Sequence, residues 1–186
     1  MRNTWIRRIS AIRKDGVESA INLTCGLNCI IGASNTGKTR IAKTVEFACG
    51  GKELPFTDKT AYEIAQVTFV TNGGEVSLSR SIHVQNTIHV KSSNPMIVPG
   101  SYSVSSRAGK SINTVLLALL GVESTRRIAT NETYHTVAFT WNAIRHLMIV
   151  PRGPNRTCTP LHSFPQKYLS SNSHTKSVLV ARASSR

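Results

Sequence analysis

Residues 32–39 constrain the fold of this chain more than any other segment, because their glycine spacing suits only a few backbone paths. They read Gly-Ala-Ser-Asn-Thr-Gly-Lys-Thr and match the pattern G-x-x-x-x-G-K-[ST] at every fixed position. The two glycines allow a tight turn in which successive backbone N–H groups point into one concavity. A loop of this kind lies between a strand and a helix, so the flanking sequence must supply both elements.

The residues on either side of the loop predict that strand and that helix. Residues 27–31 form a short apolar run, Leu-Asn-Cys-Ile-Ile, of the type found in buried strands. Behind the loop, apolar residues recur at helical spacing until the glycine pair at 50–51 ends the pattern. The apolar helical positions are Ile41, Ala42, Val45, Ala48 and Cys49. Strand, loop and helix therefore follow one another in the order that the motif requires.

The loop and the start of the helix predict a site for the phosphates of ATP together with Mg²⁺. The unpaired N–H groups and the dipole at a helix N-terminus favour an anion. Lys38 can reach the β- and γ-phosphates, and the Thr39 hydroxyl can ligate Mg²⁺. The predicted nucleotide-binding residues are Gly32, Ala33, Ser34, Asn35, Thr36, Gly37, Lys38 and Thr39, with Thr39 also the predicted metal ligand. The alternative is a glycine-rich turn that carries a Lys-Thr pair by coincidence.

Two parts of the chain predict β-structure by composition and alternation. Residues 5–12 have strand-like content, and a second short apolar run covers residues 21–23. Further along, Asn72-Gly73-Gly74 lies between the alternating segments 65–71 and 75–84 and predicts a β-hairpin. The apolar side chains that share one face of its second strand at period two are Val76, Leu78, Ile82 and Val84.

The region after the hairpin predicts a strand, a long loop and a helix. Residues 87–90 are typical of a short strand, whereas residues 92–110 are rich in Ser, Pro and Gly and predict a loop. Ser111 is a candidate helix N-cap, with four leucines behind it and Gly121 at the end of the pattern. Residues 135–140 predict a final strand, which completes an α/β domain.

Composition indicates a protein of a reducing compartment without a membrane span. No apolar run approaches the roughly 20 residues of a spanning helix, and the basic N-terminus lacks the apolar core of a signal peptide. The cysteines Cys25, Cys29, Cys49 and Cys158 form no C-x-x-C pair and predict small buried side chains. The expected location is the cytoplasm, with no membrane partner.

These segments resemble the N-terminal lobe of SMC/RecF/RecN-type ATPases, ABC-class enzymes of DNA repair and chromosome maintenance. The likeness covers residues 1–150 and rests on residues 26–51, on the hairpin with Arg80 near its end, and on residues 111–122. It implies a P-loop NTPase lobe that binds ATP and Mg²⁺ and works with a second lobe or a homodimer partner. In that family two lobes enclose two nucleotides, and one subunit's signature motif completes the other's site. Asn35 departs from the commonest arrangement, in which the Asn falls one place earlier.

Two parts of such an ATPase are missing from this sequence. Hydrolysis in the family requires a Walker B strand, an apolar run that ends in Asp and is followed by a catalytic Glu. The chain has only two aspartates, Asp15 before the loop and Asp58 in a segment that a proline interrupts. Asn72-Gly73-Gly74-Glu75 fits a hairpin turn better than a signature motif. The sequence therefore predicts a truncated lobe that binds ATP, does not hydrolyse it alone, and has no assigned catalytic residue.

Residues 151–186 differ in composition and predict a disordered basic tail. From residue 133 onward the chain carries 7 basic residues and no Asp or Glu, which supplies half of its net charge of +14. Prolines and polar residues begin directly after Val150. Two hypotheses remain open for this tail: a frameshifted or degraded continuation of an ATPase, or a genuine segment that binds DNA through its phosphates.

Two other functions also remain open. A small P-loop kinase or nucleotide transferase would use Arg126-Arg127 as a lid, although the acidic residue that it needs at a strand end is lacking. A non-enzymatic basic DNA-binding module would make the loop incidental. Replacement of Lys38 separates these functions, because only the nucleotide-binding ones depend on it.

Overall fold

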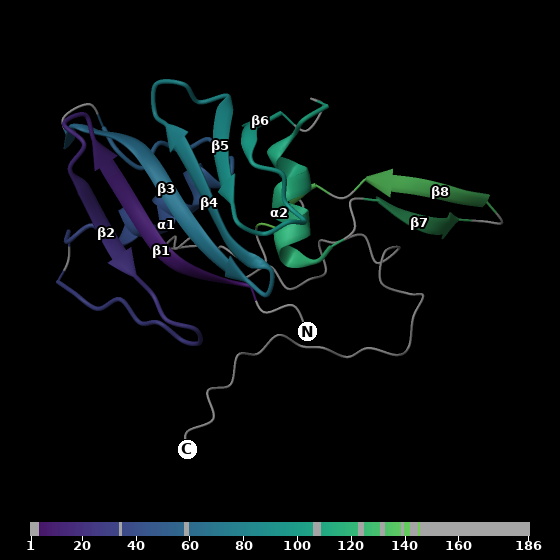
Figure 1. Cartoon of the computed structure of the whole chain (residues 1–186), viewed down its shortest axis with the longest axis horizontal. Coiled ribbons are helices and arrows are strands. Elements are labelled where there is room, and N and C mark those ends of the chain that lie inside the picture. Colours follow the sequence, from purple (N-terminus) through teal and green to yellow (C-terminus); the bar gives the residue numbers. More distant parts are fainter. Residues whose placement is uncertain are drawn as a thin grey trace, which may run out of the picture.

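A six-stranded antiparallel sheet and two helices make up a mixed α/β fold (Figure 1). The computed structural model describes residues 4–33, 35–57, 60–105, 109–122, 125–130, 133–138, 140, 141 and 145, and only the backbone of residues 125–130 and 133–138. In chain order the elements are β1 (Trp5–Arg13), β2 (Glu18–Asn22), α1 (Lys38–Ala48), β3 (Tyr62–Thr71), β4 (Gly74–Ser81), β5 (Thr87–Ser92), β6 (Gly100–Ser103), α2 (Ile112–Leu120), β7 (Thr125–Thr130) and β8 (Thr133–Ala138). The sheet order is β2-β1-β3-β4-β5-β6, and β7 pairs with β8 in a separate sheet.

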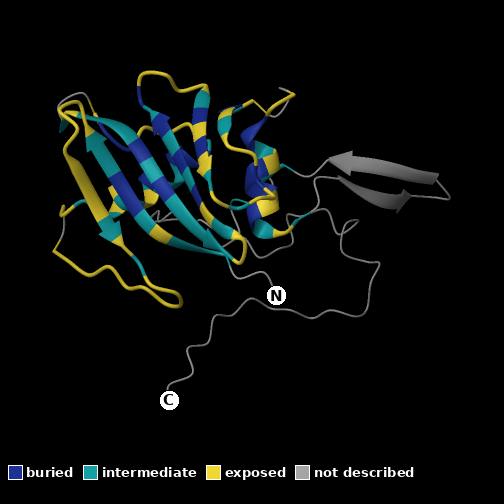
Figure 2. Ribbon diagram, in the orientation of Figure 1, coloured by how far each residue is buried: buried dark blue, intermediate teal, exposed yellow. Residues whose placement is uncertain are grey.

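Both helices cover the same face of the six-stranded sheet. Val67 of β3 lies opposite Ile9 of β1 and Leu78 of β4, and directly opposed residues point to the same face. Leu78 in turn lies opposite Val90 of β5. Ala48 of α1 packs with Ile9 and Val67, whereas α2 packs over Leu78 and Val90. The buried stripes in Figure 2 therefore lie on the face of the sheet that the helices cover, where the core consists of three neighbouring clusters.

The opposite face of the sheet carries polar side chains. The hydroxyl oxygens of Thr68 and Ser77 lie 3.0 Å apart, and Ser101 Oγ lies 3.0 Å from His89 Nδ1. One covered and one polar face is the common arrangement for an antiparallel sheet. The alternation of buried and more exposed residues along β4 matches this arrangement.

The predicted hairpin is confirmed as β3 and β4. Val76 and Leu78 have no exposed surface, as the period-two pattern requires. Ile82 is also buried, but Val84 differs from the prediction, with 59% of its surface exposed, because β4 ends at Ser81 and the alternation does not continue beyond Ile82. The predicted strand over residues 5–12 is confirmed as β1, and residues 21 and 22 of the second apolar run form the end of β2.

The loop predicted over residues 92–110 is wrong in its middle. It contains β6, where Tyr102 lies opposite Ile88 of β5, and both Tyr102 and Ile97 are buried in the core. The apolar residues in this segment are a short run at 96–98 and single residues further on, without the alternation that predicts a strand. The burial of Tyr102 and Ile97 depends on the edge that β5 presents, which is not a local property.

The second helix is confirmed with both of its ends. Ser111 Oγ accepts a hydrogen bond from the backbone N–H of Asn113 at 3.3 Å. Gly121 is left-handed at φ 68° and closes the C-terminus, since its N–H and that of Val122 donate back into the last turn. The strand predicted at 135–140 is confirmed in part as β8, whose partner β7 was not predicted.

The predicted basic tail, residues 151–186, lies outside the described residues. No helix in the described part of the chain is both long and apolar enough to cross a membrane. Trp141 is half-buried against the core formed by α2 and the sheet.

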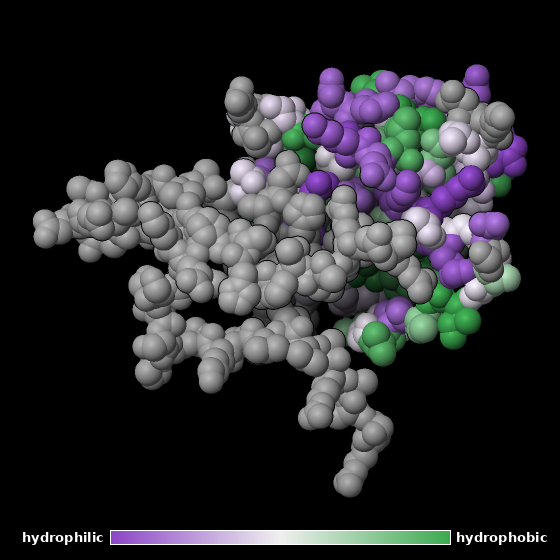
Figure 3. Space-filling view, turned by 180° about the vertical axis from the view of Figure 1, so that it is seen from behind, coloured by the Kyte–Doolittle hydropathy of each residue, from purple (hydrophilic) through white to green (hydrophobic). Residues whose placement is uncertain are grey.

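The strand predicted over residues 27–31 is wrong. These residues have no regular secondary structure, and Leu27 and Ile31 are 79% and 88% exposed. The same segment exposes Cys25 and Cys29, which corrects the prediction of buried thiols, whereas Cys49 is buried as predicted. In Figure 2 the segment after β2 is exposed along its length, and Figure 3 shows hydrophobic surface in the corresponding region. A buried strand needs a partner on each side, and none of the described strands pairs with this segment.

Candidate phosphate-binding site

The loop at residues 32–39 turns into α1 through residues with left-handed backbone. Gly37 is the N-cap, with φ 88° and ψ 6°, and Asn35 has φ 65°. Glycine adopts this conformation without steric cost, and Asn is among the few other residues that tolerate it. Helix α1 then begins at Lys38, and the N–H of Arg40 donates to the Gly37 carbonyl at 2.9 Å. The glycine at position 37 is therefore required by the turn itself.

The N-terminus of α1 is left open to an anion. No side chain caps it, and its first turn contains no acidic residue. The free N–H groups of a first turn carry the positive end of the helix dipole. A bound anion would supply the hydrogen-bond acceptors that the sequence does not.

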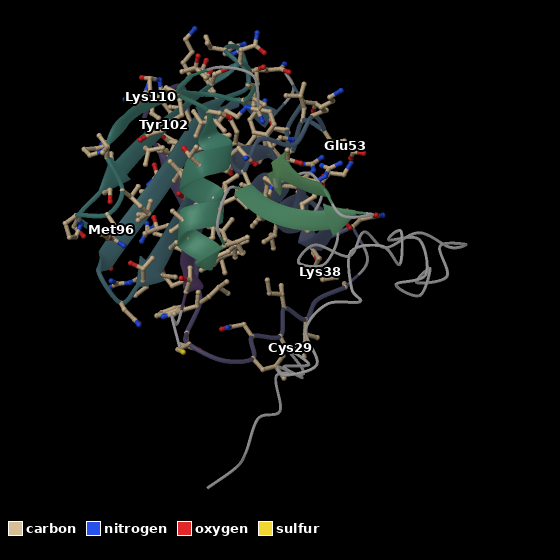
Figure 4. All side chains as sticks on the ribbon, turned by 90° about the vertical axis from the view of Figure 1, so that its right-hand side faces the viewer. Cys29, Lys38, Glu53, Met96, Tyr102 and Lys110 are labelled. Atoms are coloured by element: carbon tan, nitrogen blue, oxygen red, sulfur yellow. The ribbon has the colours of Figure 1, made fainter. Side chains whose placement is uncertain are left out.

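The Lys38 ammonium lies across the loop. Its Nζ donates to the carbonyl oxygen of Gly32 at 2.7 Å, to that of Ala33, and to Thr36 Oγ1 at 3.2 Å. Thr36 Oγ1 donates in turn to the Ala33 carbonyl at 2.8 Å. The hydrogen bonds of the Lys38 ammonium thus connect the end of the octet to its start. In Figure 4, Lys38 lies on the same side of the molecule as Cys29, away from Tyr102 and Lys110.

Close approach explains the glycine at position 32. A Cβ on Gly32 would lie 3.0 Å from Thr36 Oγ1 and 3.9 Å from Lys38 Nζ. Any side chain there would press on the hydroxyl that supports the ammonium. The two glycines of the motif are therefore needed for different reasons, one for space and one for backbone conformation.

The structure brings most of the predicted residues together. Gly32, Ala33 and Thr36 surround the Lys38 ammonium, Asn35 and Gly37 form the turn, and Thr39 is exposed in the first turn of α1. Ser34 lies outside the described residues. The open helix end and the cradle that a Cβ would fill fit a triphosphate. For Mg²⁺ the described part of the chain offers Thr39 and no cluster of three or more His, Cys, Asp or Glu side chains.

The segment that leads into the loop is tied by a side chain that sequence reasoning missed. Asn28 Oδ1 accepts from the N–H of Thr24 at 3.0 Å, and Asn28 Nδ2 donates to the carbonyls of Thr24 and Gly26 at 2.7 and 3.1 Å. An Asn side chain that replaces backbone partners in this way stabilises a turn. The segment before the loop is therefore a folded turn.

Positive charge predominates around the loop because the described carboxylates are already paired. Five of the six Asp and Glu side chains among the described residues form ion pairs with Arg or Lys, and the carboxylate of the sixth, Glu63, lies 3.6 Å from His83 Nε2. Lys38 and Arg40 have no carboxylate partner in that part of the chain. The pKa of Glu18 is lowered, first by its hydrogen bond from Arg8, so this pair remains charged at neutral pH.

Arg80 is a further residue that sequence reasoning did not assign. It is 3% exposed, and its guanidinium donates to the carbonyls of Phe47 and Gly51 at 2.6 and 2.7 Å and to that of Gln85 at 2.8 Å. The guanidinium also lies 4.1 Å from the centre of the Phe47 ring. Burial lowers the pKa of Arg80 to about 10, which keeps the side chain protonated at neutral pH. The sequence did contain a signal for the burial of Arg80, because it lies two residues after Leu78 and so shares the inward face of β4 with Val76 and Leu78.

Comparison with known proteins does not assign this chain to a family. No protein-family model matches it, and no curated protein matches its sequence with significant similarity. Its function must therefore be inferred from its own residues.

Proposed function

We propose that this chain binds Mg²⁺–ATP through residues 32–39. The observation that carries the proposal is the position of the Lys38 ammonium, which lies 2.7 Å from the Gly32 carbonyl oxygen and beside a helix N-terminus that no side chain caps. A fixed positive charge next to free N–H donors suits the phosphates of a nucleotide. In the bound state Lys38 would neutralise phosphate charge, and Thr39 would ligate the metal.

We also propose that the chain serves as the N-terminal lobe of an SMC/RecF-like ATPase and that a second lobe or a homodimer partner completes it. The exposed apolar residues Leu27, Ile30 and Ile31 support this, because they lie directly before the loop and none of the described strands pairs with them. Exposed apolar surface of this kind marks an interaction site. Sedimentation velocity with and without Mg²⁺–ATP tests whether the chain forms a homodimer. A chain that stays monomeric under both conditions would exclude the homodimer and keep only the second lobe as the partner.

Hydrolysis by the chain alone is not expected. The loop supplies ground-state contacts to the phosphates, whereas rate enhancement requires a positioned water and charge stabilisation at the γ-phosphate. The sequence contains no Walker B strand and no signature motif to provide them. A turnover of about 1 per second or faster, the ordinary range for enzymes, would contradict this part of the proposal.

Binding is tested by titrating a fluorescent ATP analogue into the whole chain in the presence of Mg²⁺. Lys38→Ala should abolish the signal, because it removes the charge at the centre of the loop. Lys43→Ala is the matched control, since Lys43 lies on the same helix and pairs with Glu53 at 3.0 Å. Equal affinity in the wild type and in Lys38→Ala would refute the proposal.

The resemblance also suggests a role in DNA repair or chromosome maintenance in the cytoplasm, with DNA as a partner. The charge distribution favours it, because paired carboxylates leave Lys14, Lys52 and Lys91 without a carboxylate partner among the described residues. Fluorescence anisotropy with a labelled duplex should show affinity that falls steeply with salt. A salt-independent signal, or none, would remove DNA as a partner.

A further inference from the structure

Helix α1 is most deeply buried at its C-terminal end. Phe47 and Ala48 in its last turn have no exposed surface, whereas Thr39 and Arg40 in its first turn are exposed. Ile41 in the first turn packs only partly buried against the core, and Thr44 is the first buried residue along the helix. The contacts at the buried end therefore contribute most to the position of the helix.

Arg80 is the side chain that holds the buried end. Two of its hydrogen bonds end on carbonyls of the α1 terminus, at Phe47 and Gly51, and a third ends on Gln85 in the turn after β4. One guanidinium thus joins the last turn of the helix, the residues that follow it, and the sheet. The negative end of the helix dipole lies at the same place and favours the positive charge.

We propose that Arg80 is a positioning residue for the phosphate-binding loop: it fixes the axial position of α1, and thereby the place at which Lys38 and Thr39 meet the nucleotide. The effect of Arg80 on ATP binding rests on the proposed function, whereas its effect on the loop rests on geometry alone. A hydrogen-bonded helix moves as a rigid rod, so a shift at Phe47 is carried to the first turn.

The chemistry at this position requires arginine. A guanidinium presents several N–H donors in one plane and reaches carbonyls on different segments at once, while its face packs on an aromatic ring. Lysine keeps the charge but cannot span the same three carbonyls with one compact ammonium. Methionine fills much of the volume but leaves the carbonyls of the helix end unpaired.

A second arginine provides an internal contrast. Arg145 pairs with Glu46 in the same turn of α1 at 2.7 Å, and each side chain is 26% exposed. This pair ends on a side chain of α1, whereas Arg80 binds the backbone carbonyls at the end of the helix. Arg145→Gln should therefore leave the loop unchanged, which separates an anchor on the helix backbone from a side-chain ion pair on the same turn.

The experiment uses the whole chain with Arg80→Lys and Arg80→Met, and Leu116→Ala as control. Leu116 is 2% exposed in α2, in the core cluster that also contains Cys49 at the end of α1, so Leu116→Ala lowers the stability of this core while it leaves the Arg80 hydrogen bonds in place. Amide chemical shifts of Gly37 and Thr39 are measured without nucleotide, and Mg²⁺–ATP affinity is measured on the same samples. Stability is followed by urea unfolding.

Both Arg80 variants should shift the Gly37 and Thr39 amides, and Arg80→Met should weaken ATP binding about tenfold, with Arg80→Lys between it and the wild type. Leu116→Ala should leave both readouts unchanged despite its lower stability. Wild-type amide shifts in Arg80→Lys, which keeps the charge and the stem and so retains the fold, would overturn the inference. If the wild type binds no Mg²⁺–ATP, the proposed function fails, but the amide shifts still decide the role of Arg80.

Discussion

The β3–β4 hairpin and the segment at residues 23–31 have similar apolar side chains, but these side chains are buried in the hairpin and exposed in the segment. In the hairpin Val67 and Leu78 face each other across two adjacent strands and have no exposed surface. In the segment Leu27 and Ile31 are almost fully exposed. The hairpin strands find each other across a tight turn, whereas a strand that enters a phosphate-binding loop needs partners from elsewhere in the sequence. Apolar sequence is therefore enough to bury a strand only when its partner is close along the chain.

The largest expected difference between the two regions is in stability. Leu78→Ala removes a fully buried side chain and should lower the free energy of unfolding by about 2–5 kcal/mol. Ile31→Ala should change it by less than about 0.5 kcal/mol, because the side chain is already exposed. Urea unfolding of both variants checks this. A large loss in Ile31→Ala would mean that the segment is packed in solution and that the contrast is wrong.

A smaller difference is expected at glycines in the two regions. A Cβ on Gly74, which has φ 133°, would lie 2.6 Å from Ser93 Oγ, so Gly74→Ala should destabilise the hairpin by about 1–3 kcal/mol. Gly26 has φ 105° but an added Cβ meets nothing within 4 Å, so Gly26→Ala should cost only about 1 kcal/mol of backbone strain. Gly109, with open space and no positive φ, is the control. Thermal unfolding ranks the three variants, and equal losses at Gly74 and Gly26 would contradict the steric argument.

Chemical modification of the cysteines compares the exposed segment with the core and perturbs the structure least. Iodoacetamide at about pH 8 should modify Cys25 and Cys29, which are exposed, and spare Cys49, which is buried under the sheet face. Peptide mass spectrometry on the native chain, and on the chain in urea as control, reads the three sites separately. Rapid native labelling of Cys49 would show that the α1 end is open.

The same thiol predicts a pH dependence. Burial, with a lesser contribution from Glu46, raises the pKa of Cys49 to about 12. The folded state therefore holds this proton more tightly than the unfolded chain, whose ordinary thiol pKa is 9.0. Stability should fall as the pH rises above about 9, and Cys49→Ala should reduce that slope.

The contrast also explains which parts of the structure were predictable from sequence. The β3–β4 hairpin, the Ser111-capped helix and the helix that follows the glycine loop were predicted correctly because each depends on neighbours within a few residues. The strand β6 was missed because its pairing with β5 is not a local property of the sequence, and the strand at 27–31 was wrong because none of the described strands pairs with it. Within the candidate site the octet was evident, but the anchor at Arg80 was not, since its partners at Phe47 and Gly51 are about thirty residues away.

The partners of Arg80 also determine how this corner of the protein can vary. All of its hydrogen bonds end on backbone oxygens, and every amino acid at position 85 provides the same oxygen. Position 51 has a separate restriction, because a Cβ there would lie 2.7 Å from the Glu46 carbonyl. Among homologous chains, substitutions should therefore accumulate at Gln85 and be excluded at Arg80 and Gly51. Substitutions would then change the turn after β4 without moving the C-terminal end of α1.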